Sequence, residues 1–273
     1  MLTQQDVIYF VVVDRFCDGT DLNNMDVDKA NPLAFHGGDF EGIRQRIPYL
    51  KALGITMLWM TPVVRNTHIP EWNSWGYHGY WPESFDQVDP HLYTPRTDIP
   101  DGSRLHLKHL VDELHANGIG VILDIVTNHV GYNHPLFVDD SAYPIKKGWF
   151  NQDDAYSPYK MSLMGLPDLN QDDVEVGDYF IGVILDWAAE TGVDCLRFDA
   201  VKHVESIFWQ RVKTYIKGKY PNLTLIAEVL DTQVNETAAY QKNFDFDSIF
   251  DFPLQHALVA ALVHDAPFSE VLA

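Results

Sequence analysis

Residues 192–203 read GVDCLRFDAVKH, and this stretch decides the fold. Within it, Cys195–Phe198, which is apolar except for Arg197, predicts a short buried strand, and the glycine before it ends a long amphipathic helix predicted over Asp173–Thr191. A further helix is predicted over Val204–Lys219 and a further strand over Leu223–Ala227. Strands and helices that alternate in this way favour a parallel sheet covered by helices.

The same alternation continues in both directions along the chain. Further strands are predicted at Val7–Val13, Thr56–Met60, Val121–Val126 and Ser248–Phe250, and further helices at Phe40–Leu53, Ser103–Asn117, Thr232–Gln241 and Leu254–Val263. Two connections, 61–101 and 128–171, are unusually long and follow strands, so we expect functional loops at the C-terminal face of the sheet. Repeated strand–helix units with long loops after the strands indicate a (β/α)8 TIM barrel. Only about six of the eight units can be found in the sequence, so the barrel is expected to be truncated after the sixth.

The composition narrows the class of partner. The chain has 273 residues, 46% of them hydrophobic, and a formal net charge of −20. That charge argues against a nucleic acid or an anionic membrane as partner, and it suits a neutral substrate or cations such as Ca²⁺. The two cysteines, Cys17 and Cys195, are expected to be small buried side chains rather than a disulfide. The run Val7–Val13 is too short for a membrane span and lacks signal-peptide features, so the protein is expected to be cytoplasmic or secreted with its signal removed.

Polar side chains gather where the predicted strands end. Arg197 and Asp199 alternate onto the same side of one strand, and Glu228 ends the next strand along the chain. Two carboxylates on neighbouring strand ends are what retaining glycoside hydrolysis needs: one attacks the anomeric carbon, and the other protonates the leaving oxygen. Arg197 would orient Asp199, and the apolar residues before Glu228 would raise the pKa of that acid.

At this point the motifs resemble those of glycoside hydrolase family 13, the α-amylase family, over essentially the whole chain. The segments that carry the resemblance are Tyr77–Trp81, Asp124–His129, Leu166–Asn170, Gly192–His203 and Ala227–Leu230. The most specific of them is the Arg-x-Asp-Ala-x-Lys-His pattern at the end of Gly192–His203. The resemblance implies a TIM barrel of the α-amylase type with a small inserted domain after the third strand.

The resemblance also implies roles for individual residues. Asp199 matches the nucleophile, Glu228 the general acid/base, and Arg197 the arginine that holds the nucleophile. The residues expected to bind the sugar chain are Tyr80, His78, His129, Trp81, Lys202 and His203. Asp124 is expected to be structural, orienting its neighbours.

Two calcium sites are implied by the resemblance, and both use the hard oxygen donors that Ca²⁺ prefers. The first would use Asn128, Asp168 and the carbonyl of His203. The second, typical of the cyclodextrin-forming relatives, would use Asp18, Asn23, Asn24, the carbonyl of Gly37 and Asp39. An ordinary turn rich in Asn and Asp is the alternative for the second set.

The sequence also departs from the family pattern. Residues 1–129 are predicted to form the first part of the barrel, 130–171 the inserted domain B, and 172–273 barrel units four to six. The family's fourth motif, with its third catalytic aspartate, is not found, and His264-Asp265 follows a predicted helix instead of a strand. We therefore expect this chain to be inactive or poorly soluble unless a C-terminal segment completes it.

The function expected from these residues is retaining hydrolysis of α-1,4-linked glucans such as starch and maltooligosaccharides. Leu166-Pro167-Asp168 resembles the α-1,4-acting members. A transglycosylase such as a cyclodextrin glucanotransferase stays open, because it uses the same covalent intermediate, and so does a catalytically incomplete glucan-binding fragment. A metal-dependent barrel hydrolase with His129 and His203 as ligands is a third class, although the strand ends lack a His-x-His pair or a carboxylate cage.

Overall fold

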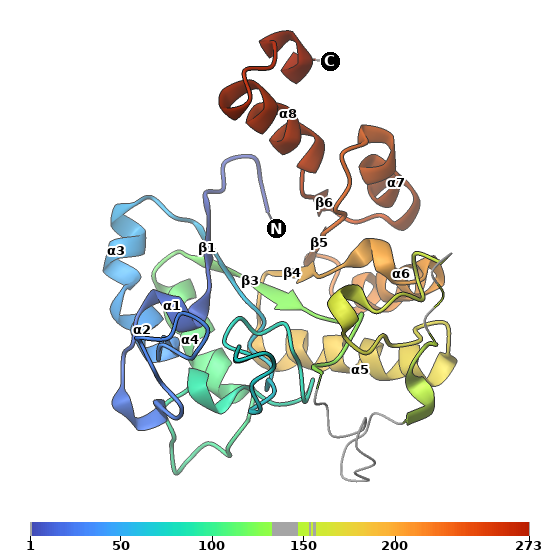
Figure 1. Ribbon diagram of the computed structural model, residues 1–273. Helices are drawn as coiled ribbons and strands as arrows, with labels where there is room; N and C mark the ends of the chain where they lie inside the picture. The colour runs from blue at the N-terminus through green and yellow to red at the C-terminus, as the bar shows by residue number, and fades with distance from the viewer. Residues whose placement is uncertain (1, 133–146, 153, 155–156, 273) are drawn as a thin grey trace.

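Six parallel strands form one sheet in the order in which they occur along the chain. The computed structural model describes residues 2–132, 147–152, 154 and 157–272. The strands are β1 (Ile8–Val11), β2 (Met57–Met60), β3 (Gly120–Ile125), β4 (Cys195–Phe198), β5 (Thr224–Ala227) and β6 (Ser248–Ile249). Each strand is hydrogen-bonded in parallel to the next one in sequence (Figure 1). The expected six β/α units and the parallel sheet are therefore confirmed.

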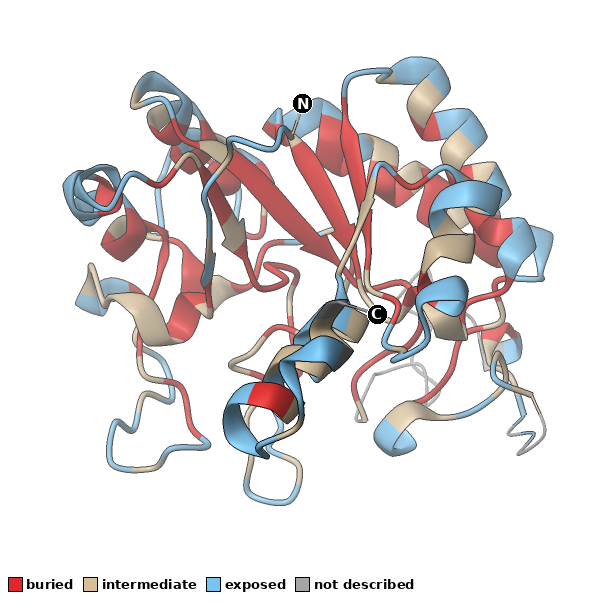
Figure 2. Cartoon of the chain, turned by 90° about the horizontal axis from the view of Figure 1, so that it is seen from above, coloured by how far each residue is buried: buried red, intermediate tan, exposed pale blue. Residues whose placement is uncertain are grey.

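Helices connect consecutive strands, and one more helix follows β6. They are α1 (Val13–Phe16), α2 (Phe40–Gln45), α3 (Ile47–Ala52), α4 (Leu105–Ala116), α5 (Val174–Thr191), α6 (Ser206–Val212), α7 (Val234–Phe244) and α8 (Phe252–Val263). Shorter helical segments are η1 (Asp21–Asn23), η2 (Pro90–Leu92), η4 (Lys147–Trp149), η5 (Leu163–Gly165), η6 (Val201–His203), η7 (Lys213–Lys217) and η8 (Phe268–Leu272). The strands β2 to β5 are largely buried (Figure 2).

Two predicted helices are divided in the structure. The helix expected over Phe40–Leu53 breaks at Arg46, because Pro48 lies at the start of α3 and lacks the N–H that would continue the hydrogen bonds of α2. The helix expected over Val204–Lys219 begins at Ser206, because Val204 has an extended backbone. Its second half, η7, is π-helical. The strand expected over Val7–Val13 also ends early, at Val11, where α1 follows.

The two faces of the sheet differ in what packs against them. One face packs on the main hydrophobic core formed with α2 to α6. The other face carries a small buried cluster of Met57, Ile122, Cys195 and Ile226, with Trp59 and Phe250 packed against it. Because side chains alternate along a strand, the residues two positions after this cluster reach the C-terminal edge on the same face. We call this second face the inner face, and it carries Asp124, Arg197 and Glu228 at its C-terminal edge.

The sheet is open at both sides. β1 pairs only with β2, and β6 only with β5, within the described residues. Ile8 and Phe10 on β1 are each 44% exposed. α8 projects from the β6 side, and Ala261 is its one buried residue (Figures 1 and 2). Among the described residues, no helix is both long and apolar enough to cross a membrane.

Candidate active site

Three carboxylates and one arginine meet at the C-terminal ends of the central strands. Asp124 lies in β3, Arg197 is paired directly opposite it in β4, and Asp199 and Glu228 follow the ends of β4 and β5. Backbone bonds extend the ladder past the strands: the amide of Asp199 donates to Ile125 (3.0 Å), and that of Glu228 donates to the carbonyl of Phe198 (3.0 Å). We call Asp124, Asp199 and Glu228 the carboxylate cluster.

Arg197 contacts every member of the carboxylate cluster. Its Nη1 donates to Oδ1 of Asp124 at 2.7 Å and to Oδ1 of Asp199 at 2.8 Å. Its Nη2 lies 2.9 Å from Oε2 of Glu228. Burial works to lower the pKa of this guanidinium, but the three carboxylates outweigh it and raise the pKa above its usual value. The expectation that Arg197 and Asp199 share one side of β4 is confirmed.

Asp124 is held by more donors than the sequence indicated. Its Oδ2 accepts hydrogen bonds from the Tyr80 hydroxyl at 2.8 Å and from the Trp59 indole at 3.1 Å. Burial raises the pKa of this fully enclosed carboxyl to about 7, against the opposing effect of Arg197. Trp59 was not among the predicted site residues, although alternation with Met57 along β2 directs it to the inner face.

Glu228 and Asp199 are the two members that solvent reaches. Their side chains are 25% and 13% exposed, whereas Asp124 is enclosed. The amide of Ala200 donates to Oε2 of Glu228 at 3.0 Å, with Ala200 itself in the left-handed region at φ 50°. Burial raises the pKa of Glu228, and Arg197 acts in the opposite direction. One carboxyl is therefore shifted toward its protonated form beside a second that bonds to the same arginine.

The histidines and aromatic residues predicted to bind sugar lie beside this cluster. The amide of Tyr80 donates to Nδ1 of His78 at 3.0 Å, and the rings of the two residues stack with centroids 5.9 Å apart. Nε2 of His129 lies 3.0 Å from the carbonyl of Tyr80. Burial lowers the pKa of His78 to about 4 and also lowers the pKa of His129. The Trp81 ring meets the His78 ring edge to face at 4.7 Å.

Lys202 and His203 lie in η6, shortly after the end of β4. Nζ of Lys202 lies 2.7 Å from Oδ2 of Asp231, a residue that the sequence did not single out. Nδ1 of His203 faces the carbonyl of Pro158 at 3.1 Å. The rings of His129 and His203 thus bond to two different backbone carbonyls. Among the described residues, no three His, Cys, Asp or Glu side chains group so as to hold a metal ion.

Two members of the first predicted calcium set, Asn128 and Asp168, lie on adjoining segments. The amide of Leu169 donates to the carbonyl of Asn128 at 2.9 Å, and a β-bridge joins His129 to Asp168. Oδ1 of Asn128 is buried and has no hydrogen-bond partner among the described residues. Oδ2 of Asp168 accepts from the Asn151 amide at 2.9 Å. Part of the predicted inserted domain, 133–146, lies outside the described residues, and its limits at 130 and 171 stay a prediction.

The residues of the second set also gather in one place. The Asn24 amide donates to Asp18 at 3.2 Å, and that of Asn23 donates to Oδ2 of Asp39 at 3.2 Å. The Oδ1 atoms of Asn23 and Asn24 are buried without hydrogen-bond partners in the part of the chain that the structure describes. A Cβ at Gly37, where φ is +86°, would lie 2.6 Å from Oδ1 of Asn24. Lys29 already contacts Asp18 at 2.8 Å.

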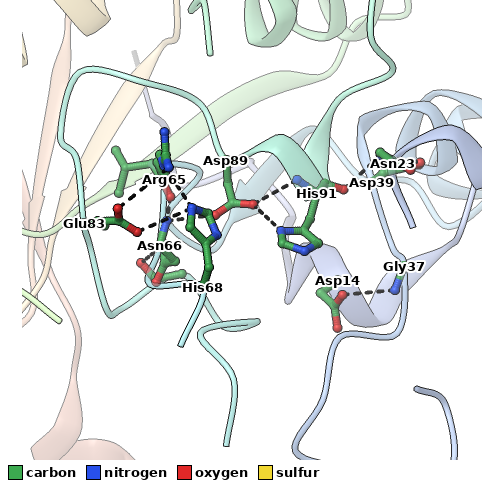
Figure 3. A network of polar contacts seen from close by, with 12 residues as sticks. Asp14, Asn23, Gly37, Asp39, Arg65, Asn66, His68, Glu83, Asp89 and His91 are labelled. Atoms are coloured by element: carbon green, nitrogen blue, oxygen red, sulfur yellow. Dashed lines mark hydrogen bonds and ion pairs between the residues drawn. The ribbon is translucent and has the colours of Figure 1, made fainter. Parts of the chain in front are cut away.

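A buried polar network that the sequence did not indicate supports this second set (Figure 3). Asp89 and His91 form an ion pair at 2.8 Å, and the carbonyl of His91 accepts from the Asn23 amide at 2.9 Å. The pair lowers the pKa of Asp89 against the effect of its burial and likewise raises the pKa of His91. Asp14 accepts from the Gly37 amide at 3.1 Å on the other side (Figure 3). These residues join the 61–101 connection to the segment after β1.

A cavity of about 620 Å³ lies elsewhere, between α2, α4 and residues 93–96. None of its lining residues belongs to the carboxylate cluster. Its two arginines are paired, Arg44 with Glu41 and Arg96 with Asp98. The strand ends therefore remain the place where groups suited to chemistry converge. Cys17 and Cys195 are both free thiols, as expected, with Cys195 buried and Cys17 half-buried.

Known proteins resemble this chain in sequence. The family described as "Alpha amylase, catalytic domain" matches this chain over residues 10–162 and 146–271. A cyclomaltodextrin glucanotransferase of Klebsiella oxytoca is 30% identical over 237 residues, which cover 76% of this chain and 34% of that protein. This chain spans between 34% and 47% of the length of three curated relatives that it matches.

Solved structures agree with the fold. An α-amylase of Anoxybacillus superimposes with a TM-score of 0.80 at 37% identity, covering 92% of this chain and 53% of that one. An α-amylase of Geobacillus thermoleovorans, solved with acarbose, gives a TM-score of 0.77 at 38% identity and covers 93% of this chain and 53% of its own. The six strands correspond to the first six units of a (β/α)8 barrel of this type.

Proposed function

This chain belongs to the α-amylase family of glycoside hydrolases, and from that premise we propose that it cleaves α-1,4-linked glucans with retention of configuration. The observation that carries the proposal is the contact of both Asp199 and Glu228 with the terminal nitrogens of Arg197. Retaining enzymes need two carboxyl groups about 5–5.5 Å apart, and a shared guanidinium holds two such groups side by side.

In the first step, a carboxylate oxygen of Asp199 attacks the anomeric carbon of a glucosyl unit. The bond to the glycosidic oxygen breaks as Glu228 gives its proton to that oxygen, and the leaving part of the glucan departs as an alcohol. In the second step, Glu228 takes a proton from water, and the resulting hydroxide oxygen attacks the same carbon. The glucosyl unit leaves Asp199, and both carboxyl groups return to their starting states.

The environment of each carboxyl supports its role. Burial raises the pKa of Glu228, which favours the protonated form that an acid needs. Asp199 bonds to Nη1 of Arg197, which orients the attacking group. Asp124 fixes the opposite side of Nη1 and holds the Tyr80 hydroxyl. Tyr80, His78, His129 and Trp81 would then enclose the glucosyl unit being transferred, and Lys202 and His203 would contact the leaving part.

Transfer to a sugar hydroxyl in place of water is the second candidate activity. The glucanotransferase of Klebsiella oxytoca among the relatives favours it, as does the second calcium set. Both activities share the glucosyl-Asp199 intermediate, so products distinguish them: cyclic or longer glucans from transfer, short linear ones from hydrolysis. A glucan-binding fragment without turnover is the third outcome of the same assay.

Calcium is proposed at two places, where the chemistry of the donors fits. Asn128 and Asp168, with the carbonyl of His203, would hold one ion between the barrel and the inserted segment, and the unpartnered Oδ1 of Asn128 supports this. The unpartnered Oδ1 atoms of Asn23 and Asn24 support the second site together with Asp18 and Asp39, and the absence of a side chain at Gly37 leaves room beside Oδ1 of Asn24. Calcium at the first place would provide a partner for Oδ1 of Asn128 and offset the charge of Asp168, and it would hold the segments that carry His129 and His203.

The test of the proposed function is reducing-sugar release from soluble starch with added Ca²⁺, for this chain and its Asp199→Asn variant. Release by the wild type that is lost in the variant supports the proposal. Release that is equal in both contradicts the role of Asp199. The open edges at β1 and β6 support a further proposal, that two more β/α units complete the active barrel. A monomeric, soluble and fully active preparation of residues 1–273 would contradict that part alone.

A further inference from the structure

A chain of ring contacts runs from the carboxylate cluster to the surface. Tyr80, bonded to Asp124, stacks on His78, and His78 meets Trp81 edge to face at 4.7 Å. Trp81 meets the ring of Tyr132 at 5.3 Å, and Tyr132 meets Trp72 at 4.7 Å. The rings come from the connection after β2 and, for Tyr132, from the one after β3.

Trp72 is the most exposed residue of this row of rings. It is 74% exposed, whereas the other rings belong to half-buried residues. It occupies the tip of a tight turn in which Glu71 and Ser74 exchange backbone hydrogen bonds of 2.9 and 2.7 Å. Both central residues of the turn, Trp72 and Asn73, have positive φ angles of 45° and 64°. A bulky residue rarely adopts that conformation, so the turn presents the indole to solvent at a cost in backbone energy.

Tyr132 is fixed beneath this indole. Its hydroxyl donates to the carbonyl of Met164 at 2.6 Å. This bond joins the beginning of the connection between β3 and α5 to its later part. The rings of Tyr132 and Trp72 meet edge to face, and most of the Trp72 surface is still exposed. Single exposed apolar residues are ordinary on proteins. The Trp72 indole differs from such residues, because it ends a row of rings that begins at Tyr80 beside the proposed catalytic carboxyls.

We propose that Trp72 and Tyr132 form an outer glucan-binding site, which holds glucosyl units several positions away from the bond that is cleaved. This inference rests on the proposed function, because it takes the ligand to be an α-glucan. The apolar faces of glucosyl rings pack on aromatic faces, and a neutral polysaccharide suits a chain with a net charge of −20. The outer site would favour long glucans, because a glucan held at Tyr80 has to pass the rings of His78, Trp81 and Tyr132 to reach Trp72.

The experiment measures binding by calorimetry with maltotriose and maltoheptaose. Trp72→Ala is expected to weaken maltoheptaose binding roughly three- to tenfold and to leave maltotriose binding unchanged. Trp72→Phe, which keeps an aromatic face, should recover most of the loss. Tyr215→Ala removes another exposed aromatic side chain, 54% exposed on η7, and should change neither affinity.

The possible results distinguish failure of the outer site from failure of the proposed α-glucan substrate. Equal affinities of Trp72→Ala and the wild type for maltoheptaose would overturn the outer site while leaving the α-glucan assignment intact. An equal loss for both oligosaccharides would also overturn it, because a general effect on the site is not a length effect. Binding of neither sugar by the wild type would reject the ligand class itself, and the outer site with it.

Discussion

Nη1 of Arg197 lies 2.8 Å from Oδ1 of Asp199, and the same nitrogen reaches Asp124 at 2.7 Å. One guanidinium nitrogen therefore fixes the distance between the proposed nucleophile and a fully enclosed carboxyl. The second nitrogen, Nη2, is left for Glu228. Asp199 and Glu228 thus contact different corners of one rigid, planar group, which sets their relative positions more tightly than two separate partners would.

Replacement of Arg197 tests this relationship. Arg197→Lys keeps the charge but supplies one point of contact in place of a planar fork, so we expect the rate of starch hydrolysis to fall about a hundredfold with a nearly unchanged fold. The measurement is kcat/KM on maltoheptaose together with the thermal midpoint. Arg104→Lys, at another arginine that bonds to a carboxylate, Glu190, is the control. Activity of Arg197→Lys within threefold of the wild type would contradict the assignment.

The two proposed catalytic carboxyls should differ in how their loss can be rescued. Asp199→Ala and Glu228→Ala are each expected to reduce kcat on the order of 10³-fold or more. External azide should restore turnover in both variants: without Asp199 it attacks the glucan directly and gives a glycosyl azide of inverted configuration, and without Glu228 it attacks the glucosyl-Asp199 intermediate and gives one of retained configuration. Product configuration measured by NMR then identifies the nucleophile. The same configuration from both variants would show that the roles are wrongly assigned.

The stability of the protein should depend on His78 at mildly acidic pH. Burial lowers the pKa of His78 from 6.5 to about 4, with His129 and Arg15 acting in the same direction and Asp199 opposing them. Between these two pH values the unfolded chain binds the proton and the folded chain does not, so stability falls as the pH is lowered, by at most about 3 kcal/mol.

The His78→Asn variant checks this dependence. Asn accepts a hydrogen bond but does not titrate, so the free energy of unfolding between pH 6.5 and 4 should fall less steeply than in the wild type. Urea unfolding at several pH values provides the measurement. His264→Asn, at an exposed residue that follows α8, should keep the wild-type slope. Parallel profiles for His78→Asn and the wild type would refute the prediction.

Calcium should raise the thermal midpoint if either proposed site exists. A ligand at about one hundred times its Kd stabilises a protein by about 2.7 kcal/mol, which corresponds to a rise of roughly 5–10 °C for a chain of this size. Asn128→Ala and Asn24→Ala should each remove part of the rise and one bound ion, counted by metal analysis. A midpoint that does not respond to Ca²⁺ or to chelator would exclude both sites.

Gly37 offers a sharper test of the second site. Gly37→Ala places a methyl group 2.6 Å from Oδ1 of Asn24 in a left-handed backbone, so we expect loss of one bound ion and destabilisation of about 1–3 kcal/mol. Gly54 has a similar φ of +77°, and nothing lies within 4 Å of a Cβ added there. Gly54→Ala is therefore the control that measures the cost of the left-handed backbone alone. Equal effects of the two variants would mean that the space beside Asn24 is not needed.

Parts of this structure follow from the sequence with little ambiguity. Cys195–Phe198 was predicted to the residue, because a buried parallel strand is a short apolar run bounded by polar residues. The common side of Arg197 and Asp199 followed from the alternation of side chains along that strand. Pro48 was a visible signal for the break between α2 and α3, but the helical periodicity on both sides of it concealed the break.

Other parts were beyond sequence reasoning. Asp89 and His91 lie in the 61–101 connection, which has no periodic pattern, so their ion pair and its bond to Asn23 depend on how that loop folds. The pairing of Lys202 with Asp231 likewise depends on the relative height of two strand ends. Period and composition describe elements, whereas these contacts arise from the distances between elements.

The sheet order, in which every strand pairs with its successor, bears on synthesis at the ribosome. Because each strand pairs with the one before it in sequence, the sheet can grow strand by strand in the direction of translation without rearrangement. Arg197 and the three carboxylates lie between residues 124 and 228, so they can meet while later residues are still being made. The price is an unpaired leading edge at each stage, and a pause in translation there would leave that edge open to another nascent chain.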